Sequence, residues 1–221
     1  IITCGLEAEW SFEKEFQKLN RDCKILAFDH TVDKSFWINR FVKDFISLLL
    51  FKKIKFYQIF DVFKYLEYSS FFGGKNKHYL KKIVSKKKDK NKQITITEAI
   101  GENKDIVLKI DIEGDEYKVL KDVNRNFDRL NLVIIEFHDL QKNLKKIKSF
   151  IKKTKLKNIH INANNYGMVD AYGIPKVIEM TLINPKKFKI KNIKTKRKYP
   201  LKGLDFKNHK RGPDIKIVFD K

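Results

Sequence analysis

Short apolar runs alternate with amphipathic segments along much of the chain. Residues 1–4 form an apolar run that ends at Gly5, and the apolar positions of residues 11–19 recur at helical spacing. A second apolar run, residues 24–28, ends at Asp29. A strand, a helix and a strand within about 30 residues are typical of a β-α-β unit, whose strands are parallel.

The same alternation returns in the second half of the chain. Apolar runs at 106–110, 132–135 and 158–161 predict strands, and the segments 116–123 and 140–153 between them have helical periodicity. We therefore expect an α/β fold with a mostly parallel sheet flanked by helices.

Residues 33–90 depart from this scheme. Paired apolar residues at helical spacing predict two basic amphipathic helices, at about 33–51 and 56–68, followed by a lysine-rich loop. Thr95 and Glu98 have the spacing of a capping box for a short helix. We interpret 33–90 as a helical, basic insertion or cap on the domain.

The end of the chain predicts two more strands, at 175–183 and 215–219, which we interpret as an antiparallel hairpin at the edge of the sheet. Between them, residues 184–200 form a basic loop. In its stretch 186–198, eight of the thirteen residues are basic.

Composition fits one folded domain over residues 1–221, because 42% of the residues are hydrophobic and the length suits a single core. The longest near-continuous apolar run, 45–51, is far shorter than the roughly 18 residues of a spanning helix, so we expect no transmembrane segment. The sequence starts at Ile1 and not at Met, and we expect it to be a piece of a longer, multidomain chain.

The net charge of +22 favours acidic partners such as nucleic acid, anionic lipid or acidic glycan. Only six of the 49 basic residues are arginine, and the richness in Lys, Ile, Asn and Phe is also what an AT-rich genome produces without selection for binding. Cys4 and Cys23 lie in or beside apolar stretches, which favours reduced, buried thiols and a cytoplasmic protein. Two cysteines are too few for a cysteine-based zinc site.

Polar residues end several predicted strands, and in a parallel sheet ligands bind at the carboxyl ends of the strands. Side chains two apart in a strand point the same way, so three pairs are expected to face one crevice: Asp111 with Glu113, Glu136 with His138, and His160 with Asn162. Asp29 stands where nucleotide-binding folds hold the ribose hydroxyls. The first loop has one glycine, Gly5, and no GxGxxG, and no P-loop motif occurs.

The segment Leu108-Lys-Ile-Asp-Ile-Glu-Gly-Asp-Glu-Tyr117 resembles the KIDIEGxE signature of the FkbM-like family of S-adenosylmethionine-dependent methyltransferases. Further segments are similar to the same family: Gly5 to Glu13, Ala27 to Asp29, Val133 to His138, His160 to Gly167, Ile174 to Thr181 and Tyr199 to Asp205. The resemblance implies a Rossmann-like class I methyltransferase fold. It also implies methyl transfer to a hydroxyl of a sugar, a glycan or a related metabolite.

The resemblance also implies site residues. S-adenosylmethionine would lie against the first loop, the end of the second strand and the KIDIEG segment, with these binding residues: Gly5, Glu7, Trp10, Ser11, Glu13, Asp29, Asp111 and Glu113. Among them, Asp111 and Glu113 would face the cationic sulfonium. Trp10 is equally explained as a core residue. The glycine-poor first loop departs from the commoner methyltransferase GxGxG.

An alcohol attacks a sulfonium methyl only when its proton is removed or its charge is held by a metal. We expect His138 to be the base, with Glu136 orienting its ring and Asp111 beside it. A divalent ion, Mg²⁺ or Mn²⁺, held by the same three residues is the alternative, and both interpretations stay open.

Four polar residues near the later strands are candidates for hydrogen bonds to a sugar acceptor: His160, Asn164, Asn165 and Glu179. A tight turn explains Asn164 and Asn165 equally well. We hypothesise a glycan O-methyltransferase active in polysaccharide assembly.

The high charge suggests an RNA or DNA methyltransferase as the first alternative. Asn184-Pro185 is followed by two lysines, which is not the Asn-Pro-Pro-aromatic motif of enzymes that methylate exocyclic amines. A non-catalytic basic binding module is the second alternative, and the residues Asp111, Glu136 and His138 argue against it.

Overall fold

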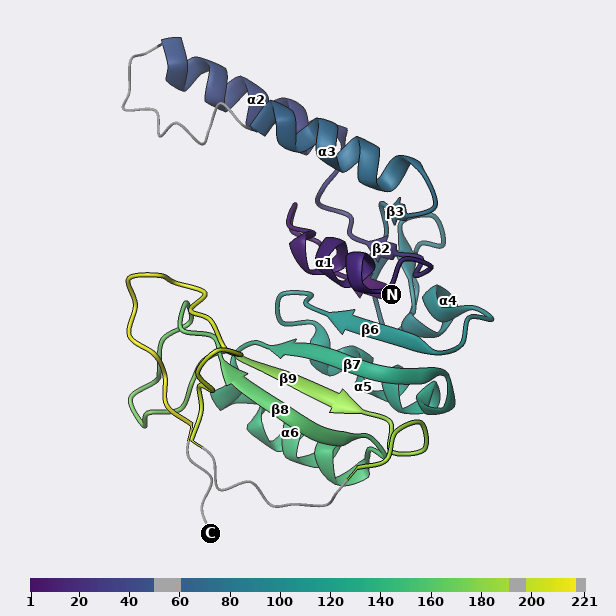
Figure 1. Ribbon diagram of the computed structural model, residues 1–221, viewed down its shortest axis with the longest axis vertical. Coiled ribbons are helices and arrows are strands. Elements are labelled where there is room, and N and C mark those ends of the chain that lie inside the picture. Colours follow the sequence, from purple (N-terminus) through teal and green to yellow (C-terminus); the bar gives the residue numbers. More distant parts are fainter. Residues whose placement is uncertain (50–60, 191–197, 218–221) are drawn as a thin grey trace.

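A computed structural model describes residues 1–49, 61–190 and 198–217 (Figure 1). Seven strands form one sheet in the order β3-β2-β1-β6-β7-β9-β8. They are β1 (Ile2–Cys4), β2 (Leu26–Phe28), β3 (Lys77–Tyr79), β6 (Ile106–Ile110), β7 (Leu130–Phe137), β8 (Lys157–Ala163) and β9 (Ile178–Ile183). The helices are α1 (Ser11–Leu19), α2 (Lys34–Leu49), α3 (Asp61–Gly73), α4 (Ile96–Ile100), α5 (Glu116–Arg125) and α6 (Leu140–Lys153).

The strands from β3 to β7 are parallel, and β9 runs antiparallel to both β7 and β8. This sheet, with α5 and α6 behind it in Figure 1, is the α/β arrangement of Rossmann-like methyltransferases. The expected fold class is therefore confirmed, including an antiparallel strand near the C-terminus.

The pairing of that antiparallel strand differs from the prediction. β9 lies inside the sheet, between β7 and β8, and its hairpin partner is β8. The segment 215–219 adds no strand to the sheet in its described part, where Ile217 makes only an isolated bridge with Tyr199. Residues 218 and 219 of that prediction lie outside the described residues.

Two helices do form within 33–90, and they extend side by side beyond the sheet (Figure 1). Residues 50–60, which include part of both predicted helices, lie outside the described residues. The same region also supplies β3, which pairs with β2, and a small separate sheet of β4 (Lys82–Ile83) and β5 (Gln93–Ile94). Most of the basic loop, 191–197, is likewise not described.

Two groups of buried apolar residues hold the fold. The larger one lies between β6, β7, β9 and the helices α4, α5 and α6, with Leu108, Ile135 and Leu182 fully buried. The smaller one packs Trp10 and Trp37 between the first loop and the two projecting helices. Because the apolar side chains of the strands are buried, the polar residues that follow them lie together at the carboxyl ends of the strands.

Candidate active site at the carboxyl ends of the strands

The carboxyl ends of β1, β2 and β6 open into a cavity of about 300 Å³. Its lining includes five of the residues expected to bind the cofactor: Gly5, Glu7, Asp29, Asp111 and Glu113. The spacing of polar residues at strand ends therefore brings these side chains to one place, as the parallel sheet requires.

Gly5 allows the first loop to pass directly over β6. Its φ is +84°, and a Cβ atom at this position would lie 1.5 Å from the carbonyl oxygen of Asp111. The backbone N–H of Asp111 donates to the carbonyl of Cys4 at 2.8 Å, which locks the two strand ends together. Only glycine fits this close approach and this backbone conformation.

Asp29 organises the first loop. Its Oδ2 accepts hydrogen bonds from the backbone N–H groups of Leu6 and Glu7 at 2.8 and 3.0 Å, and its Oδ1 accepts two from Thr31. Burial alone would raise the pKa of Asp29, but these hydrogen bonds outweigh it and hold the pKa below its usual value. The carboxylate thus fixes the loop backbone at the place where we expected it to hold a ribose.

Carboxyl groups crowd the cavity. A hydrogen bond with Glu113, together with burial, raises the pKa of Glu7 to about 8. Burial raises the pKa of Asp111 to about 6, and its buried Oδ1 has no hydrogen-bond partner. Burial and the neighbouring carboxylates Asp111 and Glu179 raise the pKa of Glu136 to about 7. Burial and the neighbouring carboxyl groups thus disfavour the ionised form of all three side chains.

His138, which follows β7, lies within this acidic group. Its Nδ1 lies 3.0 Å from Oε1 of Glu116, and its Nε2 lies 3.5 Å from Glu113 and 3.6 Å from Glu136. Burial lowers the pKa of the imidazole, but the hydrogen bond with Glu116 and the nearby carboxylates outweigh it and raise the pKa to about 9.

Glu116 is the residue that our sequence reasoning missed. It lies in the first turn of α5, is fully buried, and also accepts a hydrogen bond from the backbone N–H of Gly114 at 2.9 Å. We expected Glu136 to orient the ring, but Glu116 makes the shorter contact and holds Nδ1. The one sequence feature that pointed to Glu116 was its match to the last residue of the KIDIEGxE signature.

Three side chains lie close enough together to bind one metal ion, and this set of ligands differs from the expected one. One ligand atom each from Asp111, Glu113 and His138 lies within 4.8 Å of the other two. Our sequence reasoning named Glu136 in place of Glu113.

The family model of the methyltransferase FkbM domain matches residues 30–165, more than half of the chain. This chain belongs to the FkbM methyltransferase family. No protein with a curated description matches it. The matched range includes the acidic cluster around His138 and ends at Asn165, before β9.

Beyond His138 of this FkbM methyltransferase, polar side chains line up across three strands. Glu136 of β7 pairs in register with Glu179 of β9, which pairs with Asn162 of β8. Asn164 donates a hydrogen bond from its amide to Glu136 at 2.9 Å. Glu136, Glu179 and Asn164 therefore extend the site away from the first loop.

His160 and Asn165 face the C-terminal segment instead. His160 Nε2 lies 2.6 Å from Asp205. Asn165 is buried, accepts from the N–H of His209 at 2.8 Å and donates to backbone carbonyls of the same segment. The structure gives both residues contacts that hold residues 198–217 beside β8.

Three residues expected at the cofactor lie outside the lining of the cavity. Trp10 is 2% exposed and packs edge-on against Trp37. Ser11 begins α1 and is exposed, and the buried Glu13 accepts hydrogen bonds from Thr3 at 2.8 Å and Lys109 at 3.3 Å. Their contacts support α1 against the sheet.

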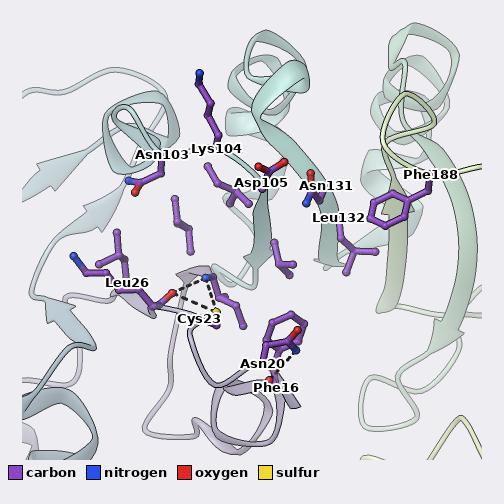
Figure 2. Close-up of a pocket in the computed structure, with 15 residues that line it drawn as sticks. Phe16, Asn20, Cys23, Leu26, Asn103, Lys104, Asp105, Asn131, Leu132 and Phe188 are labelled. Atoms are coloured by element: carbon purple, nitrogen blue, oxygen red, sulfur yellow. Dashed lines mark hydrogen bonds between the residues drawn. The ribbon is translucent and has the colours of Figure 1, made fainter. Parts of the chain in front are cut away.

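A second cavity of the methyltransferase, of about 550 Å³, lies at the amino ends of the strands, opposite the first cavity (Figure 2). It is lined by residues at the amino ends of strands, among them Leu26, Asp105 and Leu132, with Phe188 at its side. None of the predicted site residues lines it.

Proposed function

We propose that this protein is an S-adenosylmethionine-dependent O-methyltransferase that acts on a hydroxyl group of a sugar, a glycan or a related hydroxylated metabolite. The arrangement of Glu116 behind His138, with Nε2 facing the carboxylates of Glu113 and Glu136 at the strand ends, carries the proposal. It puts a base beside a cluster of carboxyl groups.

The acidic cavity suits a cationic cofactor. The chain carries +22 overall, yet Glu7, Asp111, Glu113 and Glu136 gather where β1, β6 and β7 end. The buried, unpaired Oδ1 of Asp111 is the kind of atom that a bound cation satisfies. S-adenosylmethionine supplies a methyl group on a positively charged sulfur, and Asp111 and Glu113 are the residues that would face it.

His138 removes the proton of the acceptor. The proton of the acceptor hydroxyl would move to Nε2 during methyl transfer, while Nδ1 keeps its hydrogen bond to Glu116. The imidazole must be neutral to act, and its pKa of about 9 describes the site without ligand. A positive charge bound beside the same carboxylates lowers that pKa and favours the neutral base.

The row of Glu136, Glu179 and Asn164 supports a polyhydroxylated acceptor. These carboxylate and amide groups accept and donate hydrogen bonds along one face of β7, β9 and β8, next to the base. Phosphate groups are a poor match for this acidic row, which favours sugar hydroxyls over nucleic acid.

Calorimetric titration with S-adenosylhomocysteine, with and without Mg²⁺ or Mn²⁺, tests the proposal. We expect micromolar binding by the wild-type chain, and binding that depends on the ion would favour the metal alternative for Asp111, Glu113 and His138. The His138→Ala variant should bind this product but lose transfer to a panel of sugars.

The absence of binding by the folded chain would refute the proposal, and full transfer by His138→Ala would refute the role of the base. Steeply salt-dependent RNA binding together with RNA methylation would instead favour the nucleic-acid alternative.

A further inference from the structure

Helix α2 carries an apolar stripe on its outer side. Ile38, Phe41, Val42 and Phe45 follow the i, i+3, i+4, i+7 spacing of one helix face, and Ile46 continues it. Each of the five is between 45% and 60% exposed. Single exposed apolar residues are ordinary on protein surfaces, but a continuous stripe marks a binding surface.

The helix pair is fixed to the rest of the protein at its base. Trp37 of α2 packs against Tyr68 of α3, with ring centroids 5.2 Å apart. Lys64 of α3 binds Glu9 at 3.2 Å, and the hydroxyl of Tyr68 lies 2.5 Å from His78 Nδ1. The stripe therefore lies on a helix pair that is firmly anchored at its base, and Figure 1 shows the two helices projecting beyond the sheet.

The segment that follows α3 is strongly basic. Residues 75–92 contain nine lysines and one acidic residue, and most of these lysines are exposed. The protein thus combines an exposed apolar stripe with a large excess of cations, which is the combination that binds an anionic lipid surface.

We infer that the stripe of α2 docks on an anionic membrane surface, with its apolar side chains entering the headgroup region while the large excess of basic residues in the chain attracts it to the phosphates. The charge disfavours the simplest competitor, a second copy of the chain, because two copies with +22 repel each other. Among the described residues no helix is long and apolar enough to cross a bilayer.

Vesicle flotation tests this inference without reference to catalysis. The probes are vesicles of phosphatidylcholine alone and of phosphatidylcholine with phosphatidylglycerol. We expect the wild-type chain to float with the anionic vesicles only, and less so at high salt. The triple variant Ile38→Ser, Phe41→Ser, Phe45→Ser should bind at least about tenfold more weakly, because three apolar side chains no longer leave water.

A matched control removes three exposed apolar residues from other parts of the chain: Leu19→Ser, Leu204→Ser and Phe206→Ser, at positions 85%, 60% and 79% exposed. This variant should bind like the wild type. Equal binding by the stripe variant and the wild type would overturn the inference, as would equal binding to both vesicle types. So would a dimer in light scattering that the stripe variant dissociates.

A second readout does not depend on a loss of binding. Phe41→Cys in a Cys23→Ser background can be labelled with an environment-sensitive dye, since the remaining cysteine, Cys4, is buried. We expect the emission to shift to the blue on anionic vesicles. The same label at Leu19→Cys should not shift, and an unshifted label at position 41 would refute the docking.

Discussion

Replacing Glu116 with glutamine removes the negative charge behind the imidazole of His138 and keeps the volume of the side chain. The two side chains are 3.0 Å apart, and this hydrogen bond is the largest of the effects that raise the pKa of His138 from 6.5 to about 9. One pKa unit is worth about 1.36 kcal/mol, so the whole rise corresponds to about 3 kcal/mol before solvent screening reduces it. We expect Glu116→Gln to lower the pKa by at least about one unit.

The sign of the effect on stability follows from the direction of this shift. Because the folded-state pKa lies above the ordinary value, the interaction stabilises the fold fully below about pH 6.5 and is lost as the pH rises through about 9. The variant should therefore be less stable than the wild type at pH 6, with the difference shrinking at pH 10. Urea unfolding at the two pH values measures this difference.

The assay for the pKa itself is an NMR titration of the imidazole resonances of His138. Glu15→Gln is the matched control, because Glu15 is an exposed glutamate of α1 whose ionic partner is Lys18. The reasoning is refuted if His138 titrates near 6.5 in the wild type. It is also refuted if Glu116→Gln and Glu15→Gln leave its pKa equally unchanged.

Three further outcomes are expected. Asp29→Asn should weaken S-adenosylhomocysteine binding by at least about tenfold in calorimetry, because the loop N–H groups lose their charged acceptor; normal binding would contradict this role. Thr95→Ala should lower the free energy of unfolding by about 1 kcal/mol in urea, because it removes the capping box with Glu98. Glu7→Gln should raise the melting temperature at pH 9 but not at pH 5, since the raised pKa of Glu7, about 8, makes its ionised form costly in the fold; equal gains at both pH values would argue against it.

Much of the sheet was predictable from the sequence because its central strands are apolar runs. β6 and β7 stand out in this way, whereas β3 was missed because Lys77-His78-Tyr79 has no apolar run. Its pairing with β2 rests on backbone hydrogen bonds at the edge of the sheet, and these carry no mark in the side chains. The position of β9 inside the sheet is set by tertiary packing, which the periodicity of the sequence does not reveal.

The candidate site was likewise predictable only in part. Spacing of two residues within a strand predicts that Glu136 and His138 share a side, and their side chains lie 3.6 Å apart. Glu116 escaped this reasoning because it comes from a helix, and packing of α5 on the sheet brings it to His138. The roles of the site residues stay predictions until the titrations above are made.

The order of the strands has a consequence for dissecting this protein. The matched family segment, 30–165, contains β3, β6, β7 and β8 but lacks β1, β2 and β9. Since β1 and β2 join β3 to β6, and β9 joins β7 to β8, the excised segment retains only one ladder of the seven-stranded sheet, between β6 and β7. Open strand edges are templates for aggregation. The boundaries of the matched segment are therefore unsuitable as the ends of an expressed fragment. A fragment that contains all seven strands of the sheet must run from β1 to β9.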